Sequence, residues 1–235
     1  MIFKGTATAL VTPFTRTGVD FDALDRILDD QLAGGVDAVV VLGTTGEPAT
    51  MTAEEKTSVI EFAVAKLKGK LPVIVGTGSN STQAAVEMSV RAEKLGADAL
   101  LVVTPYYNKA TQGGLEEHFG KIANAVNIPI ICYNVPGRTG VNLLPATFAK
   151  IAEHPNIAAI KEASGNMEQI EEAIRLSEGK AVVYSGDDGI TVPVMAMGGV
   201  GVISVVSNAA PRFTSEMTSA MLAGDLKKAA EMQLK

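Results

Sequence analysis

A single lysine ends one of the most apolar segments of this 235-residue chain. The run from Ile157 to Ile160 leads directly into Lys161, and Glu162 follows. Because an unpaired ammonium is costly to bury, Lys161 needs either a carboxylate partner or a reason to lose its proton. Glu162 is badly placed as a partner, since neighbouring strand residues point to opposite faces. The pattern favours a neutral amine that forms a Schiff base with a carbonyl compound, and an ion pair with another carboxylate is the alternative.

Other groups suited to proton transfer and anion binding also follow apolar runs. Tyr133 lies near the end of one run, and a phenol beside an amine can move protons during imine formation. Thr44 and Thr45 stand in the glycine-rich turn GTTGE, whose hydroxyl and N–H groups suit a small carboxylate. Arg138 lies in the loop segment PGRTG, where it is either a solvated residue or a clamp that binds a carboxylate with two hydrogen bonds.

The remaining candidates for chemistry are weaker. His118 falls in a predicted helix and His154 in a helix-to-strand turn, which disfavours a Ser-His-Asp triad and a His-based metal site. Asp187 and Asp188 are explained more simply by a turn and a helix cap than by a divalent cation. Cys132, the only cysteine, sits in an apolar run and is expected to be a buried hydrophobic residue.

Short β-branched runs alternate with amphipathic helices along the whole chain. The predicted strands are 6–12, 37–44, 71–78, 98–105, 128–135, 157–164, 181–187 and 201–208. They are apolar throughout, as parallel strands covered on both faces are. Eight strand–helix units predict an α/β protein with a closed (β/α)8 TIM barrel, and a doubly wound open sheet is the alternative. In such a barrel the C-terminal ends of the strands carry the active site, and Lys161, Tyr133, Thr44, Thr45 and Arg138 are all predicted to lie there.

Composition and segment lengths restrict the class of protein further. The barrel is expected to occupy residues 1–224, and 225–235 to begin a C-terminal helical segment that is otherwise missing. The formal net charge of −6 and the lack of a long basic block disfavour nucleic acid as a partner. No apolar run reaches the length of a bilayer span, and we read no signal peptide. We therefore expect a cytoplasmic protein without a membrane partner.

The segments GTTGE, TPYYNK, YNVPGRTG, IKEASGN and YSGDD occur in order and with barrel spacing. In this the chain resembles the dihydrodipicolinate synthase family, within the pyruvate-dependent class I aldolases that include N-acetylneuraminate lyase. The resemblance covers essentially all of residues 1–235. It implies that Lys161 forms an imine with pyruvate, that the enamine attacks L-aspartate 4-semialdehyde, and that ring closure releases 4-hydroxy-tetrahydrodipicolinate. This lyase chemistry serves lysine (diaminopimelate) biosynthesis and implies no cofactor beyond the covalent imine and no metal.

The resemblance also implies the helpers of Lys161. Tyr133, Thr44 and Tyr107 match the proton-relay residues of the family. The residue that corresponds to Tyr107 reaches across a dimer interface into the neighbouring subunit. We therefore expect a homodimer or homotetramer.

Substrate-binding residues are implied in the same way. Thr45 matches the group that holds the pyruvate carboxylate, and Arg138 matches the residue that binds the carboxylate of the semialdehyde. Gly186 and Ile203 line the site through backbone groups and packing. The sialic acid lyase branch typically lacks the arginine, so PGRTG favours the synthase. Another pyruvate-dependent aldolase such as N-acetylneuraminate lyase, or a barrel with impaired activity, is the alternative.

Two departures from the family pattern carry expectations of their own. Some members bind L-lysine at a dimer-interface pocket through a serine, histidines and a glutamate. Here Asn80 and Tyr106 are kept, but the other matching positions hold Pro48, Ala53, Lys56 and Ala84. We expect weak or absent inhibition by L-lysine. Members also usually carry several tens of further C-terminal residues, so we expect lower stability or altered assembly of this chain.

Overall fold

Eight parallel strands close into a barrel in a computed structural model that describes residues 1–235. The strands follow one another around the barrel in chain order, and β1 pairs with β8 to close it. They are β1 (Gly5–Ala9), β2 (Ala38–Val41), β3 (Val73–Gly76), β4 (Ala99–Val103), β5 (Ile130–Asn134), β6 (Ile157–Glu162), β7 (Val182–Ser185) and β8 (Gly201–Ser204). The predicted (β/α)8 barrel is confirmed, and the open doubly wound sheet is wrong.

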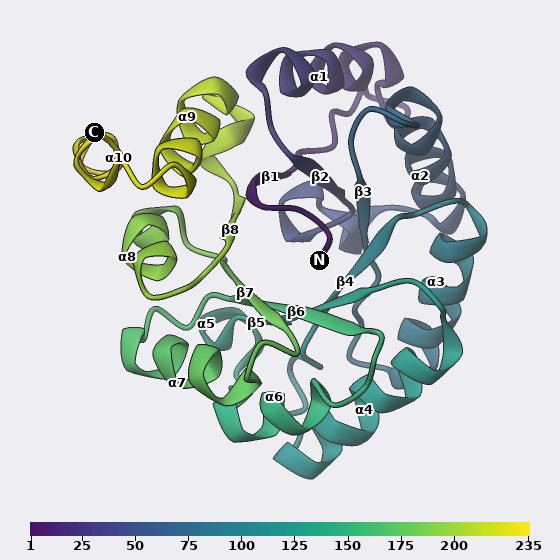
Figure 1. The fold of residues 1–235 in the computed structure, drawn as a ribbon. Helices are drawn as coiled ribbons and strands as arrows, with labels where there is room; N and C mark the ends of the chain where they lie inside the picture. The colour runs from purple at the N-terminus through teal and green to yellow at the C-terminus, as the bar shows by residue number, and fades with distance from the viewer.

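A ring of helices surrounds the strands (Figure 1). The helices are α1 (Phe21–Gly34), α2 (Ala53–Leu67), α3 (Thr82–Lys94), α4 (Gln112–Ala125), α6 (Pro145–Ile151), α7 (Met167–Ser177), α8 (Thr191–Ala196) and α9 (Pro211–Leu222). Shorter turns of helix are η1 (Thr44–Gly46), η2 (Pro48–Thr50), α5 (Pro136–Thr139), η3 (Asp188–Ile190) and η4 (Val206–Asn208). α2 begins with a capping box, in which the side chains of Thr52 and Glu55 each accept a hydrogen bond from the other residue's backbone N–H.

Both faces of the strands are buried, as their apolar composition predicts. Alternate residues point into the barrel, where Val40, Leu101, Ile131 and Ile203 belong to one apolar cluster. The residues between them point outward and form a larger core with the surrounding helices. This alternation decides which strand residues can reach the interior and which must face the helices.

The N-terminal end of the barrel is closed by an aromatic pair. Phe3 precedes β1 and stacks on Tyr184 of β7, with ring centroids 4.2 Å apart and an interplanar angle of 10°. The Tyr184 hydroxyl donates a hydrogen bond of 2.8 Å to the Phe3 carbonyl. The opposite end of the barrel, where the strands finish, stays available for a site.

The predicted strands extend too far at their C-terminal ends. β8 stops at Ser204, whereas the apolar pattern predicts a strand through residue 208. The N–H groups of Val205 and Val206 donate to Oδ2 of Asp188 at 2.9 and 3.1 Å. That carboxylate, distant in sequence, draws the chain out of the ladder and into η4, which residue type alone does not reveal.

The last helix, α10 (Leu226–Gln233), lies outside the ring beside α9 (Figure 1). Ala229 and Met232 are its buried residues, and they cluster with Val192 of α8 and Met217 of α9. The predicted division at residue 224 falls in the turn between α9 and α10, and the assignment of a separate segment stays a prediction. None of the helices combines the length and the apolar character that crossing a bilayer requires.

Replacing Tyr184 with Phe should weaken the closed end of the barrel. The change removes the buried hydrogen bond to Phe3 but keeps the stacked ring, so we expect the free energy of unfolding to fall by about 1 kcal/mol. Urea denaturation measures the loss. Tyr106→Phe is the control, because that side chain is 40 % exposed. An equal loss in both variants would show that the bond to Phe3 contributes nothing.

Candidate active site

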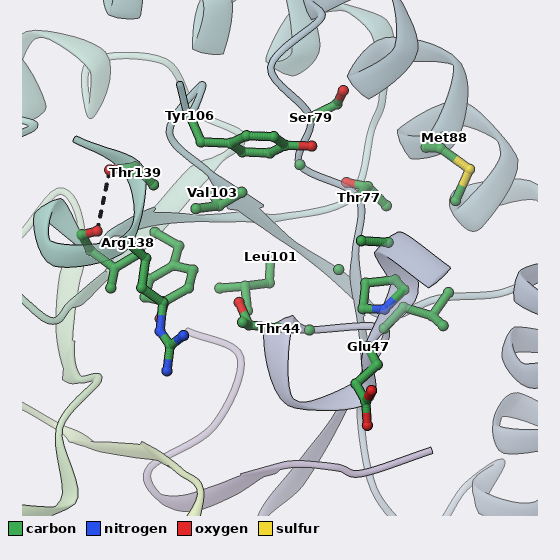
Figure 2. A pocket seen from close by; sticks show the side chains of 18 of the residues that line it. Thr44, Glu47, Thr77, Ser79, Met88, Leu101, Val103, Tyr106, Arg138 and Thr139 are labelled. Atoms are coloured by element: carbon green, nitrogen blue, oxygen red, sulfur yellow. Dashed lines mark hydrogen bonds between the residues drawn. The ribbon is translucent and has the colours of Figure 1, made fainter. Parts of the chain in front are cut away.

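A cavity of about 410 Å³ opens at the C-terminal ends of β2 to β5. In Figure 2, Thr44 lies in the middle of this cavity, with Arg138 on one side and Glu47 on the other. Tyr106 lies along a further edge. Tyr133 also lines the cavity, so three of the predicted site residues, from two different loops and one strand, share it.

Lys161 and Tyr133 stand next to each other inside the barrel. They are paired in register on β6 and β5, and Lys161 Nζ lies 4.4 Å from the centroid of the Tyr133 ring. Only 4 % of Lys161 and 6 % of Tyr133 is exposed. No carboxylate forms an ion pair with Lys161. The alternative expected for this lysine, a structural ion pair, is therefore absent.

Burial shifts the titration of both groups. It lowers the pKa of Lys161 to about 8; the negative charge of Asp188 opposes this shift and the positive charge of Arg138 adds to it. Burial also raises the pKa of the Tyr133 phenol, although the charge of Arg138 counteracts the rise. Near neutral pH the site therefore combines a protonated phenol with an amine that gives up its proton readily.

Gly186 lies against Lys161, and Ile203 lies in the apolar interior of the barrel. A Cβ on Gly186 would lie 3.0 Å from both Cγ and Cε of Lys161, so a larger residue would displace the lysine. Ile203 on β8 is fully buried in the same interior cluster as Tyr133. The close approach of Gly186 to Lys161 arises because β6 and β7 are neighbours in the barrel. The sequence around Gly186 does not reveal this contact.

Thr44 and Thr45 begin η1, directly after β2. The first N–H groups of a helical turn have no acceptor within it, so they suit an anion. Leu42 and Glu47 flank this turn with φ of 57° and 54°, a conformation that is unfavourable for residues other than glycine. Thr44 lines the cavity, whereas Thr45 does not.

Tyr107 is the one predicted catalytic residue that lies apart from the others. Its side chain is 85 % exposed and does not line the cavity. Its φ is 75°, a strained value for a bulky residue, and its N–H donates to the Thr139 carbonyl at 3.1 Å. Within one chain Tyr107 stands outside the cavity, so its role stays a prediction about a neighbouring subunit.

The histidines and the cysteine stand outside the cavity. His118 is buried in α4, where Nδ1 lies 2.9 Å from the Thr82 hydroxyl and burial lowers its pKa to about 4. His154 lies in the turn after α6, and Cys132 is fully buried in β5. No group of three His, Cys, Asp or Glu side chains is arranged to hold a metal ion.

Sequence reasoning missed the polar residues that stand behind the reactive ones. Asn134 follows Tyr133 and Glu162 follows Lys161, and both are buried on the outer side of the barrel. A signal was present in the sequence, because each is a polar residue at the end of an apolar strand. What they bond to depends on loops and helices that only the fold brings near.

Comparison with known proteins identifies close relatives of the whole chain. The sequence model of the dihydrodipicolinate synthetase family matches residues 2–235. A 4-hydroxy-tetrahydrodipicolinate synthase from Geotalea daltonii is 51 % identical over 234 residues, covering 100 % of this chain and 81 % of the relative. The crystal structure of dihydrodipicolinate synthase from Thermotoga maritima superposes with a TM-score of 0.97 at 43 % identity, covering 99 % of this chain and 80 % of that one. A monomeric variant of dihydrodipicolinate synthase gives 0.97 at 44 % identity, covering 99 % and 79 %.

Replacing Lys161 with Met should stabilise the protein in a pH-dependent way. The shift of the lysine pKa from 10.5 to about 8 corresponds to roughly 3 kcal/mol of penalty for the buried charge. Below pH 8 the folded lysine is charged and the whole penalty applies. Between pH 8 and 10.5 only the unfolded state binds the proton, so the penalty fades as pH rises.

Chemical denaturation between pH 6 and 11 measures this difference. We expect Lys161→Met to be the more stable protein below pH 8 and the two curves to converge above it. Lys121→Met is the control, because Lys121 is exposed on α4. A gap that does not change with pH would contradict the burial of a titrating amine at position 161.

Proposed function

The chain belongs to the dihydrodipicolinate synthetase family, and on this basis we propose that it joins pyruvate to L-aspartate 4-semialdehyde through an imine on Lys161. The product is 4-hydroxy-tetrahydrodipicolinate, an intermediate of lysine and diaminopimelate biosynthesis. One observation carries the proposal: Lys161 is a buried amine without a counter-ion, with a pKa lowered to about 8, beside a phenol that lines the cavity.

The first step is the attack of neutral Lys161 Nζ on the ketone carbon of pyruvate. Burial favours the neutral amine that this attack needs. The resulting carbinolamine loses water, and its departing oxygen must take up a proton. Tyr133 is suited to supply it, because its raised pKa keeps the phenol protonated and its ring lies against Lys161 Nζ. Thr44, in the same cavity, completes the proton relay.

The second step forms the carbon–carbon bond. Loss of a proton from the methyl carbon of the imine gives an enamine, and this carbon attacks the aldehyde carbon of the semialdehyde. The aldehyde oxygen gains a proton and becomes a hydroxyl group. The amino group of the semialdehyde then attacks the imine carbon, which closes the ring and releases Lys161 as a free amine. Each step is a carbonyl addition, an elimination or a proton transfer, so the proposal includes no redox cofactor and no metal.

Two groups are proposed to hold the carboxylates. The Arg138 guanidinium lies at the edge of the cavity, where its charge acts on both Lys161 and Tyr133. It is suited to bind the carboxylate of the semialdehyde with two hydrogen bonds. Thr45 and the free N–H groups of η1 are proposed to bind the carboxylate of pyruvate. A cationic residue at this edge favours an amino-acid aldehyde over the uncharged N-acetylmannosamine.

We propose that two or more copies of the chain assemble around Tyr107. This residue is almost fully exposed and held in a strained backbone conformation, which suggests that a contact outside the single chain maintains it. Tyr106 beside it is also partly exposed. A second copy placed against this loop, as a homodimer or as half of a homotetramer, would receive Tyr107 in its own proton relay.

Trapping with borohydride tests the proposed function. Incubation with pyruvate and borohydride should reduce the imine and leave a stable adduct on Lys161, which peptide mass spectrometry locates. The trapping rate should rise with pH as the amine loses its proton around pH 8. Lys161→Met should give no adduct, and Lys121→Met should react like the original protein. Adduct formation elsewhere, or none at all, would refute the mechanism.

A second measurement identifies the aldehyde. With pyruvate present, L-aspartate 4-semialdehyde should be consumed and N-acetylmannosamine should not. Turnover of the sugar alone would assign the chain to the sialic acid lyase reaction.

Inhibition by L-lysine should be weak or absent. Lys56, Ala84 and Tyr106 line the same cavity. Lys56 adds an ammonium that repels the side chain of lysine, and Ala84 lacks the carboxylate that the resemblance places at this position in lysine-sensitive relatives, so binding should be weakened although Glu47 also lines the cavity. Titration of activity with L-lysine should show no inhibition at concentrations that half-inhibit a lysine-sensitive relative. The double variant Lys56→His, Ala84→Glu should bind lysine more tightly, and strong inhibition of the unmodified protein would overturn the prediction.

A further inference from the structure

A buried polar network lies on the outer side of β5 and β6, directly behind the reactive residues. Asn134 and Glu162 are paired in register and point outward, whereas Tyr133 and Lys161 point into the barrel. Both residues are buried, with 0 % of Asn134 and 1 % of Glu162 exposed. The Asn134 amide donates to Oε1 and Oε2 of Glu162 at 3.2 and 3.0 Å, which ties the two strand ends together.

Every group that bonds to the Glu162 carboxylate is a donor. Besides Asn134, the Ser164 N–H donates to Oε1 at 2.7 Å and the Gln169 amide donates to Oε2 at 3.2 Å. No lysine or arginine pairs with it. An ionised carboxylate accepts all of these bonds, whereas a neutral amide in its place offers only one accepting oxygen.

The carboxylate also determines how the neighbouring amides are oriented. Asn134 Nδ2 donates to Oδ1 of Asn142 at 2.9 Å, and Asn142 Nδ2 donates to Oε1 of Gln169 at 2.7 Å. Asn134 cannot turn over, because its Oδ1 accepts from the Leu143 N–H at 2.9 Å. The amides of Asn134, Asn142 and Gln169 therefore have one orientation in which every donor bonds to an acceptor. The Glu162 carboxylate is the acceptor that fixes this orientation.

This network reaches three groups of the proposed site at once. Asn134 and Glu162 are adjacent in the chain to Tyr133 and Lys161, so holding the outward pair also holds the inward pair. Asn142 and Leu143 end the loop after β5 that carries Arg138. Gln169 lies in the first turn of α7. Asn166 is the N-cap of this helix, and its side chain accepts a hydrogen bond from the Gln169 N–H. One buried carboxylate thus links the amine, the phenol and the guanidinium from behind.

We propose that Glu162 is a positioning residue of the active site, whose carboxylate sets the geometry of Lys161, Tyr133 and the Arg138 loop through Asn134 and Asn142. This inference rests on the proposed function, since it concerns the same imine chemistry. In this proposal Glu162 makes no contact with the substrates. It acts by keeping the nucleophile and its proton donor within the narrow range of positions that the reaction needs.

Glu162→Gln is the first test, because it keeps the size of the side chain. It replaces one accepting oxygen with an NH2 donor, although all the surrounding groups are themselves donors. The Gln169 amide can turn to accept from the new donor, but Asn142 must then turn too, and its Nδ2 would meet Nδ2 of the fixed Asn134. One donor–donor contact therefore remains wherever the amides turn. We expect imine trapping with pyruvate and kcat each to fall tenfold to roughly a hundredfold, and KM for the semialdehyde to rise.

Glu87→Gln is the matched control, because it alters an exposed carboxylate that accepts from the Gln83 amide at 2.8 Å. It should leave both rates unchanged.

The readouts separate positioning from stability. Trapping rate, kcat, KM and the pH profile of trapping are measured at a temperature where circular dichroism shows every variant to be folded. If Glu162→Gln lowers the melting temperature but leaves all four unchanged, Glu162 is only structural and the inference is wrong. If the unmodified protein forms no adduct at Lys161, it is the proposed function that fails.

Asn142→Ala keeps the inference testable should Glu162→Gln not fold. It removes the link between the network and the loop without changing Glu162. We expect KM for the semialdehyde to rise several-fold, because the Arg138 loop loses an anchor, with little change in trapping by pyruvate. An unchanged KM would contradict a connection between the network and Arg138.

Discussion

The burial of Lys161 without a counter-ion is the constraint on which the site depends. An amine that is 4 % exposed loses most of its hydration, which brings its pKa down to about 8. The apolar interior that causes this shift is supplied by all the strands together, since the cluster around Lys161 includes residues from β1 to β8. The barrel thus maintains a reactive amine at a cost to its own stability, which the rest of the core must offset.

The alternation of side chains along a strand gives the two sides of the barrel separate tasks. Tyr133 and Lys161 face an interior that is dry enough to change their proton affinity. Asn134 and Glu162, one residue further, face a set of hydrogen-bond donors that leave no polar group unmatched. In the proposed mechanism, chemistry and positioning are therefore supplied by adjacent residues. A one-residue slip of either strand would exchange the two faces and destroy both.

Rigid and strained parts of the structure are distributed accordingly. The amine and phenol stand on paired strands, whereas the groups proposed to bind the substrates' carboxylates stand on the turns after β2 and β5. Residues with positive φ other than glycine are concentrated at this end of the barrel, at Leu42, Glu47, Tyr107 and Lys109. Such conformations persist only where surrounding contacts maintain them. For Tyr107 those contacts are proposed to come from a second copy of the chain.

The fold and the reactive lysine of this protein could be predicted from the sequence alone. The alternation of apolar runs with amphipathic helices predicted the barrel, and Lys161 at the end of an apolar strand predicted a reactive amine, because hydrophobic period and burial are local properties. The ends of the strands could not be read in this way, since β8 stops where Asp188 bonds to Val205. The need for glycine at 186 and the partners of Glu162 arise between segments far apart in the chain. Hydrogen bonds and close contacts of that kind depend on distances in space, so only the tertiary structure decided them.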